Sequence, residues 1–249
     1  MNHNVRTLAV FAASSVAIIL LTSISLPVRS DQRDEGKVTE AANQSAKAAD
    51  VFNAIMKIPD KSIPRDLLRR AKAIAVFPQV IKASFVVGAE GGRGVVSRRT
   101  ASGWSDPVFF RAGGGSVGPQ IGASATDIVL VFMNDEAMSG LMKDRFELGA
   151  DAEVAGGPVG REASAGTDAL MKAQILSYSR SRGLFAGVSL KGIVVKPEDD
   201  LNEAVYNKKA RELLARETSV TGSGATLTAF PQAIERYTPS SKTDHPSQQ

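Results

Sequence analysis

Residues 109–134, FFRAGGGSVGPQIGASATDIVLVFMN, decide the fold, because three consecutive glycines lead through Pro119 into a mostly apolar stretch. Residues 121–132 are rich in Ile, Val and Thr, and residues 128–132 are continuously apolar. A β-branched apolar run of this length indicates a buried strand. The glycines ahead of it predict a Gly-rich bend that joins two strands of a tightly curved sheet.

Two glycine motifs that can carry chemistry overlap in this stretch. Residues 114–118 fit the G-x-S-x-G elbow of serine hydrolases, and Gly113, Gly115 and Gly118 fit the G-x-G-x-x-G of dinucleotide sites. Both motifs need a helix directly after the glycines, because its N-terminus provides an oxyanion donor or holds the pyrophosphate. Pro119 and a strand-like stretch follow instead. The sequence therefore favours a sheet corner over either chemical loop.

A hydrolase that uses Ser116 is retained as a weaker alternative. Such a serine needs a base, and the chain contains only His3, ahead of an apolar leader, and His245, in the polar C-terminal part. Neither histidine is expected beside Ser116. We therefore expect a protein that is not an enzyme, with no catalytic residue, no cofactor and no metal site.

The first thirty residues have the pattern of an export signal. Residues 8–26, nineteen in all, carry no charge, Arg6 precedes them and the small-residue sequence PVRS follows at 27–30. We expect cleavage after Ser30 and an exported protein, periplasmic or associated with the cell envelope. A retained membrane anchor is the alternative, since this apolar length comes close to what spans a bilayer.

Charge and cysteine content narrow the classes of partner. The chain has 30 Lys and Arg against 26 Asp and Glu, a net charge of +4, and residues 1–30 hold two arginines and no acid, so the remainder has 28 minus 26, or +2. So small an excess argues against a nucleic-acid partner. The absence of cysteine excludes disulfides, zinc–cysteine sites and lipid attachment through cysteine. With 249 residues and 43% hydrophobic content, one domain with a sizeable core is expected.

Helices are expected on either side of a Gly-rich, strand-forming region. Apolar spacing predicts an amphipathic helix over 37–57, a second helix over about 64–74 and a last one over 197–217. Nineteen of the 22 glycines lie within 88–192, where short β-branched runs alternate with turn residues, including an expected hairpin turn at 90–93.

These elements predict an α+β fold in which amphipathic helices flank a strongly curved, Gly-rich, mainly antiparallel sheet or barrel-like core. The expected organisation is an export signal over 1–30, a single domain over 31–217 and a mostly flexible polar tail over 218–249. A short structured segment around 230–237 is the one exception allowed in that tail.

Local basic clusters are the candidate ligand-binding residues. One face of the second expected helix carries three basic residues, Arg65, Arg69 and Lys72. An anionic lipid surface would attract this face. The alternative is that the face is simply exposed to solvent. The planar arginine guanidinium can donate two parallel hydrogen bonds to phosphate oxygens. Two arginine pairs at expected strand ends therefore complete the predicted lipid-binding set. The alternative is that these arginines only make the turns soluble. These pairs are Arg98 with Arg99 and Arg180 with Arg182.

Five ordered blocks of the chain carry a family resemblance: residues 71–78 (AKAIAVFP), 88–96, 118–123 (GPQIGA), 155–161 (AGGPVGR) and 178–190 (YSRSRGLFAGVSL). Together, over about residues 40–210, they resemble the SYLF domain of bacterial envelope proteins and of eukaryotic lipid-binding proteins of endocytosis and actin regulation. The resemblance implies a non-enzymatic phospholipid-binding module. Because no SH3 or FYVE domain accompanies these blocks, an actin role is not expected of this chain.

The leading hypothesis is therefore a lipid-binding protein of the cell envelope, which recognises anionic phospholipid headgroups at a membrane surface through its basic clusters. An alternative from a different class is a structural envelope protein that self-associates through its sheet into a homo-oligomer and has no specific lipid ligand.

Overall fold

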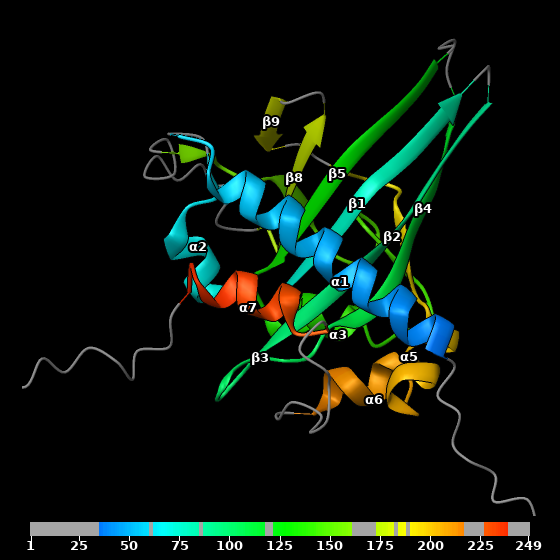
Figure 1. The fold of residues 1–249 in the computed structure, drawn as a ribbon. Coiled ribbons are helices and arrows are strands. Elements are labelled where there is room, and N and C mark those ends of the chain that lie inside the picture. Colours follow the sequence, from blue (N-terminus) through cyan, green and yellow to red (C-terminus); the bar gives the residue numbers. More distant parts are fainter. Residues whose placement is uncertain are drawn as a thin grey trace, which may run out of the picture. The chain divides into compact units, whose positions relative to one another are not determined.

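The computed structural model describes residues 35–59, 62–84, 87–117, 122–160, 173–181, 184–187, 190–216 and 227–238. All of them belong to one unit, Arg33–Gln249. A strongly curled open sheet forms a half-barrel in this unit, and helices pack against it (Figure 1). This confirms the predicted α+β class with a curved, mainly antiparallel sheet flanked by helices.

The sheet has ten strands within the described residues, in the order β6-β10-β4-β2-β1-β5-β8-β7, with β3 paired to β2 and β9 to β8. All of these pairs are antiparallel except β7 with β8. The strands are β1 (Ala73–Ser84), β2 (Val87–Thr100), β3 (Gly103–Trp104), β4 (Val108–Val117), β5 (Gly122–Phe132), β6 (Phe146–Glu147), β7 (Val154–Gly156), β8 (Ile175–Ser181), β9 (Leu184–Gly187) and β10 (Val194–Pro197).

The helices of the described residues cover both faces of this sheet. They are α1 (Glu35–Met56), α2 (Arg65–Arg70), α3 (Asp135–Gly140), α5 (Asp199–Tyr206), α6 (Ala210–Ala215) and α7 (Ala229–Glu235). The long amphipathic helix expected over 37–57 is α1. The second expected helix is shorter than predicted, because the chain is already extended at Ala71 and pairs as β1 from Ala73.

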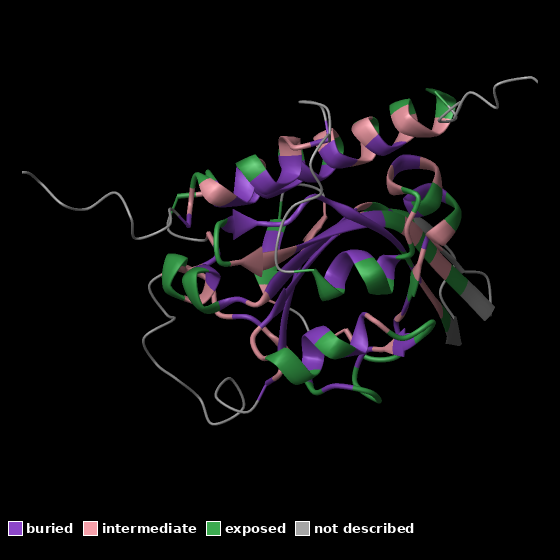
Figure 2. Cartoon of the chain, turned by 90° about the horizontal axis from the view of Figure 1, so that it is seen from below, coloured by how far each residue is buried: buried purple, intermediate pink, exposed green. Residues whose placement is uncertain are grey.

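The central strand β1 separates two hydrophobic cores. Ile74 and Val76 point to the core beneath α1, whereas Ala73, Ala75 and Phe77 point to the opposite core, and all five are completely buried. Figure 2 shows the same pattern as buried strands between helices that are exposed on their outer sides. A strand buried on both faces needs a continuous apolar run, which explains why the sequence of β1 does not alternate.

The core beneath α1 includes α7, which matches the short structured segment expected around 230–237 within an otherwise polar tail. Phe230 and Phe52 are both fully buried and meet edge to face, with ring centroids 6.4 Å apart. The hydroxyl of Ser45 donates to the carbonyl of Leu227 over 2.7 Å and accepts from the N–H of Phe230 over 3.2 Å. The folded unit thus continues past residue 217, the boundary expected from composition.

The Gly-rich segments lie inside strands rather than in turns. Residues 90–93, the expected hairpin turn, belong to β2 and pair with β4 on one side, and residues 113–115 belong to β4. Residues 118–121, which connect β4 to β5 along the chain, lie outside the described residues, and β2 and β1 lie between these two strands in the sheet.

The glycines of β2 make room for an irregular neighbour. The pairing register of β1 shifts between Phe77 and Val80, and Gln79 there has a left-handed backbone with φ of 50°. A Cβ on Gly92 would come within 2.9 Å of Val80, and one on Gly94 would overlap the Phe77 ring. Local sequence does not reveal this close approach, which is why Gly91 and Gly92 have the pattern of turn residues.

The described residues 184–187 and 190–216 form short elements. Strand β9 pairs with β8, and strand β10 pairs with β4 and β6. The expected final helix is divided into α5 and α6 at Asn207, which adopts the left-handed conformation that asparagine tolerates. The side chain of Asp199 then accepts a 2.9 Å bond from the N–H of Ala210 and holds the two helices together.

Candidate functional site

The basic residues predicted on the second helix lie on and just after α2. Arg65 and Arg69 are exposed, and Arg69 forms an ion pair with Asp66 of the same helix. The Arg65 guanidinium lies 5.8 Å from the ring centre of Tyr237. Lys72 pairs with Asp135 at the start of α3, with 3.1 Å between the Nζ and Oδ2 atoms.

Arg98 and Arg99 lie near α2, at the end of β2, but their head groups hold the fold together. Arg99 donates to the carbonyls of Leu68 (2.7 Å) and Ala71 (2.9 Å), which closes the C-terminal end of α2, and its guanidinium lies 4.4 Å from the ring centre of Trp104. Burial lowers the pKa of Arg99 from its usual value, and nearby Glu235 opposes this. Arg98 donates to carbonyls at the end of α6.

Arg180 lies away from this end of the sheet. The register places Arg98 opposite Ala73 at the start of β1, whereas Arg180 lies opposite Asp127, well inside β5. Arg180 donates twice to Oδ2 of Asp127 (2.9 and 2.7 Å), and Oδ1 of Asp127 accepts from the N–H of Gln79 over 3.0 Å. Arg180 therefore braces the irregular part of β1. Arg182 lies outside the described residues.

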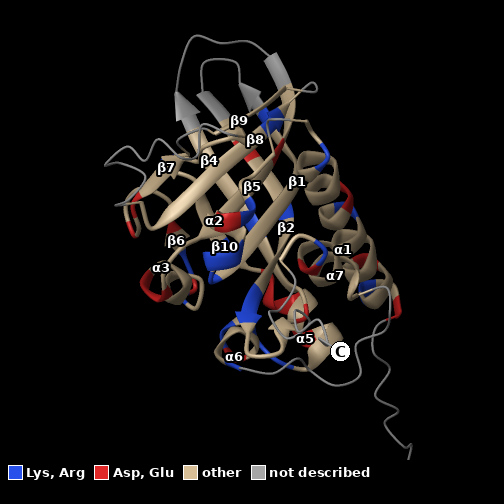
Figure 3. Ribbon diagram, turned by 90° about the vertical axis from the view of Figure 1, so that its left-hand side faces the viewer, with Lys and Arg blue, Asp and Glu red and all other residues tan. Residues whose placement is uncertain are grey.

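Five predicted residues, together with Arg70, thus lie on α2 or at the strand ends beside it, and we call this basic group the α2 end. It consists of Arg65, Arg69, Arg70, Lys72, Arg98 and Arg99. The backbone links it together, since the N–H of Arg99 donates to the carbonyl of Lys72 over 2.8 Å. Figure 3 shows how the Lys and Arg residues are distributed over the fold.

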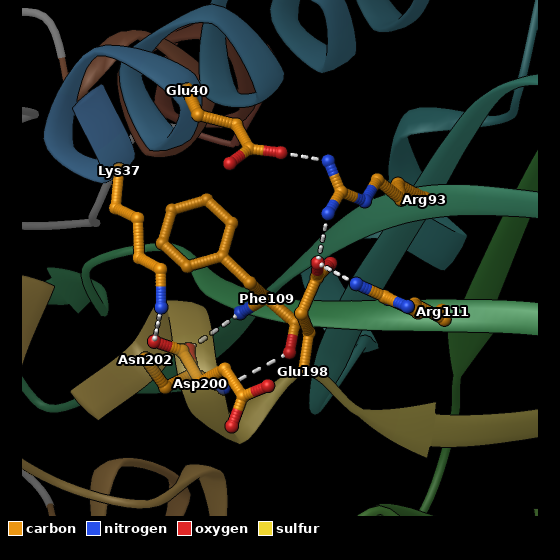
Figure 4. Close-up of polar contacts among 8 residues, drawn as sticks. All are labelled: Lys37, Glu40, Arg93, Phe109, Arg111, Glu198, Asp200 and Asn202. Carbon is orange, nitrogen blue, oxygen red and sulfur yellow. Dashed lines mark hydrogen bonds and ion pairs between the residues drawn. The ribbon is translucent and has the colours of Figure 1, made fainter. Parts of the chain in front are cut away.

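A second charged site is built from residues that sequence analysis did not single out. Arg93 of β2 and Arg111 of β4 are direct cross-strand partners. Each donates from Nη2 to the same oxygen, Oε1 of Glu198, over 2.6 Å (Figure 4). The Glu198 side chain is only 3% exposed, and its other oxygen, Oε2, is buried and has no hydrogen-bond partner among the described residues. The hydrogen bond to Glu198 raises the pKa of Arg111.

Glu198 is held rigidly where β10 gives way to α5. Its N–H donates to the carbonyl of Phe109 over 3.0 Å, and its own carbonyl accepts from the N–H groups of Leu201 and Asn202, both over 3.0 Å. The Asn202 side chain in turn accepts from the N–H of Phe109 (2.9 Å) and donates to its carbonyl (3.0 Å). The buried carboxylate is therefore a fixed anchor for the two arginines.

The N-terminal half of α1 covers this arginine pair. Glu40 forms an ion pair with Arg93, and Lys37 donates to the carbonyl of Asp200 over 3.4 Å (Figure 4). Beneath the helix lies a cleft of about 770 Å³, which we call the α1 cleft. Its lining is Gly36, Thr39, Glu40, Asn43, Gln44, Lys47, Pro78, Gln79, Ile81, Gly91, Gly92, Arg93, Arg111 and Ala112.

A neighbouring cleft of about 640 Å³ shares Arg111 with the α1 cleft and also contains Arg145, Lys196 and Glu198. The sequence does not predict the arginine pair, because the pattern of residues 90–93 indicates a turn at Arg93. Once β2 pairs with β4, Arg93 and Arg111 become neighbours, but that register is not readable from either strand alone.

The hydrolase alternative finds no support in the geometry. Ser116 lies in extended β4, opposite Gly88 of β2, so it is not on the strand-to-helix turn that an elbow needs. His3 and His245 lie outside the described residues. Within the described part of the chain, no group of three acidic or histidine side chains could hold a metal ion. None of the described helices is both long enough and apolar enough to cross a membrane.

The fold and its charged surfaces define an α+β half-barrel domain with arginine-lined clefts. A family model described as "Ysc84: Las17-binding protein actin regulator" matches residues 113–236. The chain belongs to this Ysc84 family, also called SYLF, which is a family of binding and regulatory domains. This confirms the resemblance seen in the five sequence blocks.

Named relatives extend the similarity across most of the chain. The SH3 domain-containing YSC84-like protein 1 of Rattus norvegicus and that of Homo sapiens are each 35% identical to it over 176 residues, covering 68% of this chain and 52% and 51% of the relatives. LAS seventeen-binding protein 3 of Saccharomyces cerevisiae is 32% identical over 182 residues, covering 72% of this chain and 38% of the relative. The chain thus spans about half the length of the animal relatives.

Proposed function

We propose that this chain is a non-enzymatic binding module that recognises anionic phospholipid headgroups at a membrane surface through its α2 end. The observation that carries the proposal is the excess of positive charge there. Six basic side chains face three acidic ones, namely Asp66, Asp135 and Glu235, which leaves a local charge of +3. Within the described residues, neither Arg65 nor Arg70 has an acidic side chain within ion-pair distance.

The expected interaction is weak and depends on salt. A basic residue near an anionic membrane contributes about 1 kcal/mol, so a local charge of +3 contributes roughly 3 kcal/mol. This electrostatic attraction falls off within a Debye length of about 8 Å at physiological ionic strength. Arg98 and Arg99 add to the field because the groups they bond are neutral carbonyls.

Charge reversal on α2 tests the proposal. Arg65→Glu/Arg70→Glu changes the charge of the α2 end by four units, and we expect binding to phosphatidylglycerol vesicles in a co-sedimentation assay to fall by about tenfold or more. Binding of the unaltered chain should weaken as salt increases, and phosphatidylcholine vesicles should not bind. Lys191→Glu/Lys196→Glu is the matched control, since it makes the same change of charge at exposed positions elsewhere. Equal losses in both variants would contradict a site at the α2 end.

We also propose that the protein acts in the cell envelope after export by residues 1–30. The support is the uncharged leader and its small-residue end, and both lie outside the described residues. N-terminal sequencing of the mature protein should begin at Asp31. A chain that keeps residues 1–30 at the membrane would instead favour the anchor.

Self-association is the second candidate, and two exposed apolar side chains favour it. Ile81 of β1 is 58% exposed and Leu184 of β9 is 78% exposed. Leu184→Ser with Ile81→Ser should abolish oligomers seen by light scattering if the sheet mediates assembly. The names of the Las17-binding relatives state a protein partner for those proteins. If this chain bound neither vesicles nor a second copy of itself, a protein partner would be the next candidate to test.

A further inference from the structure

We propose that the α1 cleft binds the phosphate group of a small hydroxyl-bearing phosphate ester, either free or as the headgroup of a lipid, and that Arg93 and Arg111 hold this phosphate. The site is independent of the α2 end, because none of the residues of the α2 end lines the α1 cleft.

The arginine pair itself points to an anion. Like charges directly opposite each other on antiparallel strands repel, so Arg93 facing Arg111 destabilises the sheet unless a negative group lies between them. Glu198 supplies one such group from a fixed position. Because both Nη2 atoms lie 2.6 Å from a single carboxylate oxygen of Glu198, the two guanidinium groups converge on one point, and both arginines line the α1 cleft.

The two guanidinium groups keep further donors for a ligand. Each guanidinium has five N–H donors. Arg93 uses Nη1 for Glu40 and Nη2 for Glu198, whereas Arg111 contacts Glu198 through Nη2 alone among the described residues. The Arg111 side chain is also 57% exposed. Two forks that arrive from neighbouring strands suit the tetrahedral oxygens of a phosphate, while a planar carboxylate is satisfied by one fork.

The α1 side of the cleft carries side-chain amides that can bind the hydroxyl groups of a ligand. Both amide atoms of Gln44, Oε1 and Nε2, are buried and have no hydrogen-bond partner among the described residues, and Gln44 lines the cleft from α1. Buried polar groups are normally paired, so an unpaired one calls for an explanation, and a bound molecule is the one we propose for Gln44. A hydroxyl both donates and accepts, so it can satisfy either amide atom. Asn43 and Gln79 add two more side-chain amides to the lining.

The size of the cleft and the exposure of one counterion, Glu40, allow the ligand to enter. A volume of about 770 Å³ falls within the range of small-molecule sites, about 300 to 1,000 Å³. Glu40 is 37% exposed and lies on the outer helix, whereas Glu198 is buried and held by the backbone. An incoming phosphate therefore displaces Glu40 from Arg93 and leaves Glu198 in place.

Two variants with opposite signs test this site on the full chain. Isothermal titration calorimetry with glycerol 3-phosphate and with inorganic phosphate measures the free ligands, and co-sedimentation with phosphatidic acid vesicles measures the lipid headgroup. Arg111→Gln should weaken binding by about tenfold or more, because charge-assisted bonds are lost. Glu40→Gln should tighten it by roughly two- to fivefold, because an exposed competing carboxylate is removed. Arg145→Gln, in the neighbouring cleft, is the matched control and should change nothing.

The outcomes separate the sources of the phosphate. Soluble esters that bind with this pattern of variants identify a free ligand, and vesicles alone that bind with the same pattern identify a headgroup. Binding that is indifferent to Arg111→Gln, no binding of any of the three probes, or no gain from Glu40→Gln would each overturn the proposal. Because Glu40→Gln leaves Glu198 paired with both arginines, it remains informative even if Arg111→Gln fails to fold.

Discussion

Replacement of Phe230 by alanine is expected to destabilise the whole domain, because α7 belongs to the core beneath α1. Phe230 is completely buried, and its ring meets Phe52 edge to face at 6.4 Å. Truncation of a buried phenylalanine costs about 3–5 kcal/mol, to which the lost aromatic pair contributes about 1 kcal/mol. For a domain of this size, we expect the melting temperature to fall by roughly 10 °C.

Urea unfolding followed by far-UV circular dichroism measures this effect. The midpoint should fall with an unchanged m-value, which shows that the same surface is exposed on unfolding. Gln232→Ala on the exposed side of α7 is the control, and it should change the unfolding free energy by less than about 0.5 kcal/mol. If Phe230→Ala lowered the unfolding free energy by no more than the control does, α7 would be a loosely attached tail and the boundary near residue 217 would stand.

Three further predictions address the sheet. Gly157→Ala should destabilise the fold by about 1–3 kcal/mol in urea unfolding, because its Cβ would overlap the Tyr178 ring. Gly114→Ala should cost less, because its Cβ comes closest to the flexible Glu90 side chain, at 3.0 Å; equal effects would refute this packing. Arg180→Ala should cost about 1–3 kcal/mol by leaving the partly buried Asp127 unpaired, and unchanged thermal unfolding would show that the pair is dispensable. Burial raises the pKa of the Tyr178 hydroxyl, whereas the same group in the unfolded chain has a pKa of about 10. Above that pH the unfolded chain loses the proton and the folded state keeps it, so the stability of the fold should fall as the pH rises above about 10. Tyr178→Phe should reduce this fall in stability.

The prediction for Arg180 also revises an expectation drawn from the sequence. The sequence predicts Arg180 at a strand end, where it is a candidate for phosphate binding. In the structure it makes two hydrogen bonds to Asp127, which also holds the backbone of Gln79. A loss of binding in an Arg180 variant would thus reflect a less stable fold as well as a missing ligand contact. Arg65 and Arg70 of α2 are therefore better positions at which to test binding.

Several features follow from the sequence alone because they depend on local patterns. The apolar spacing of residues 37–57 predicts α1, and the β-branched run at 121–132 predicts β5, since periodicity reports which faces are buried. The same local information argues against an elbow at Ser116, because no helix follows the glycines. The five blocks that carry the family resemblance are likewise a property of the chain itself, and they identify the family without any knowledge of the strand order.

Only the tertiary structure decides which residues meet. Nothing local places Arg93 opposite Arg111 or brings Glu198 between them, because the register between β2 and β4 and the position of α5 depend on contacts between residues far apart in the chain. The role of the glycines in β2 depends on the irregularity in the neighbouring strand, and the place of α7 depends on the apolar face of α1. Pairing between distant segments is set by packing of the whole sheet, so the sequence determines the elements and their buried faces, whereas the structure determines the charged cleft between them.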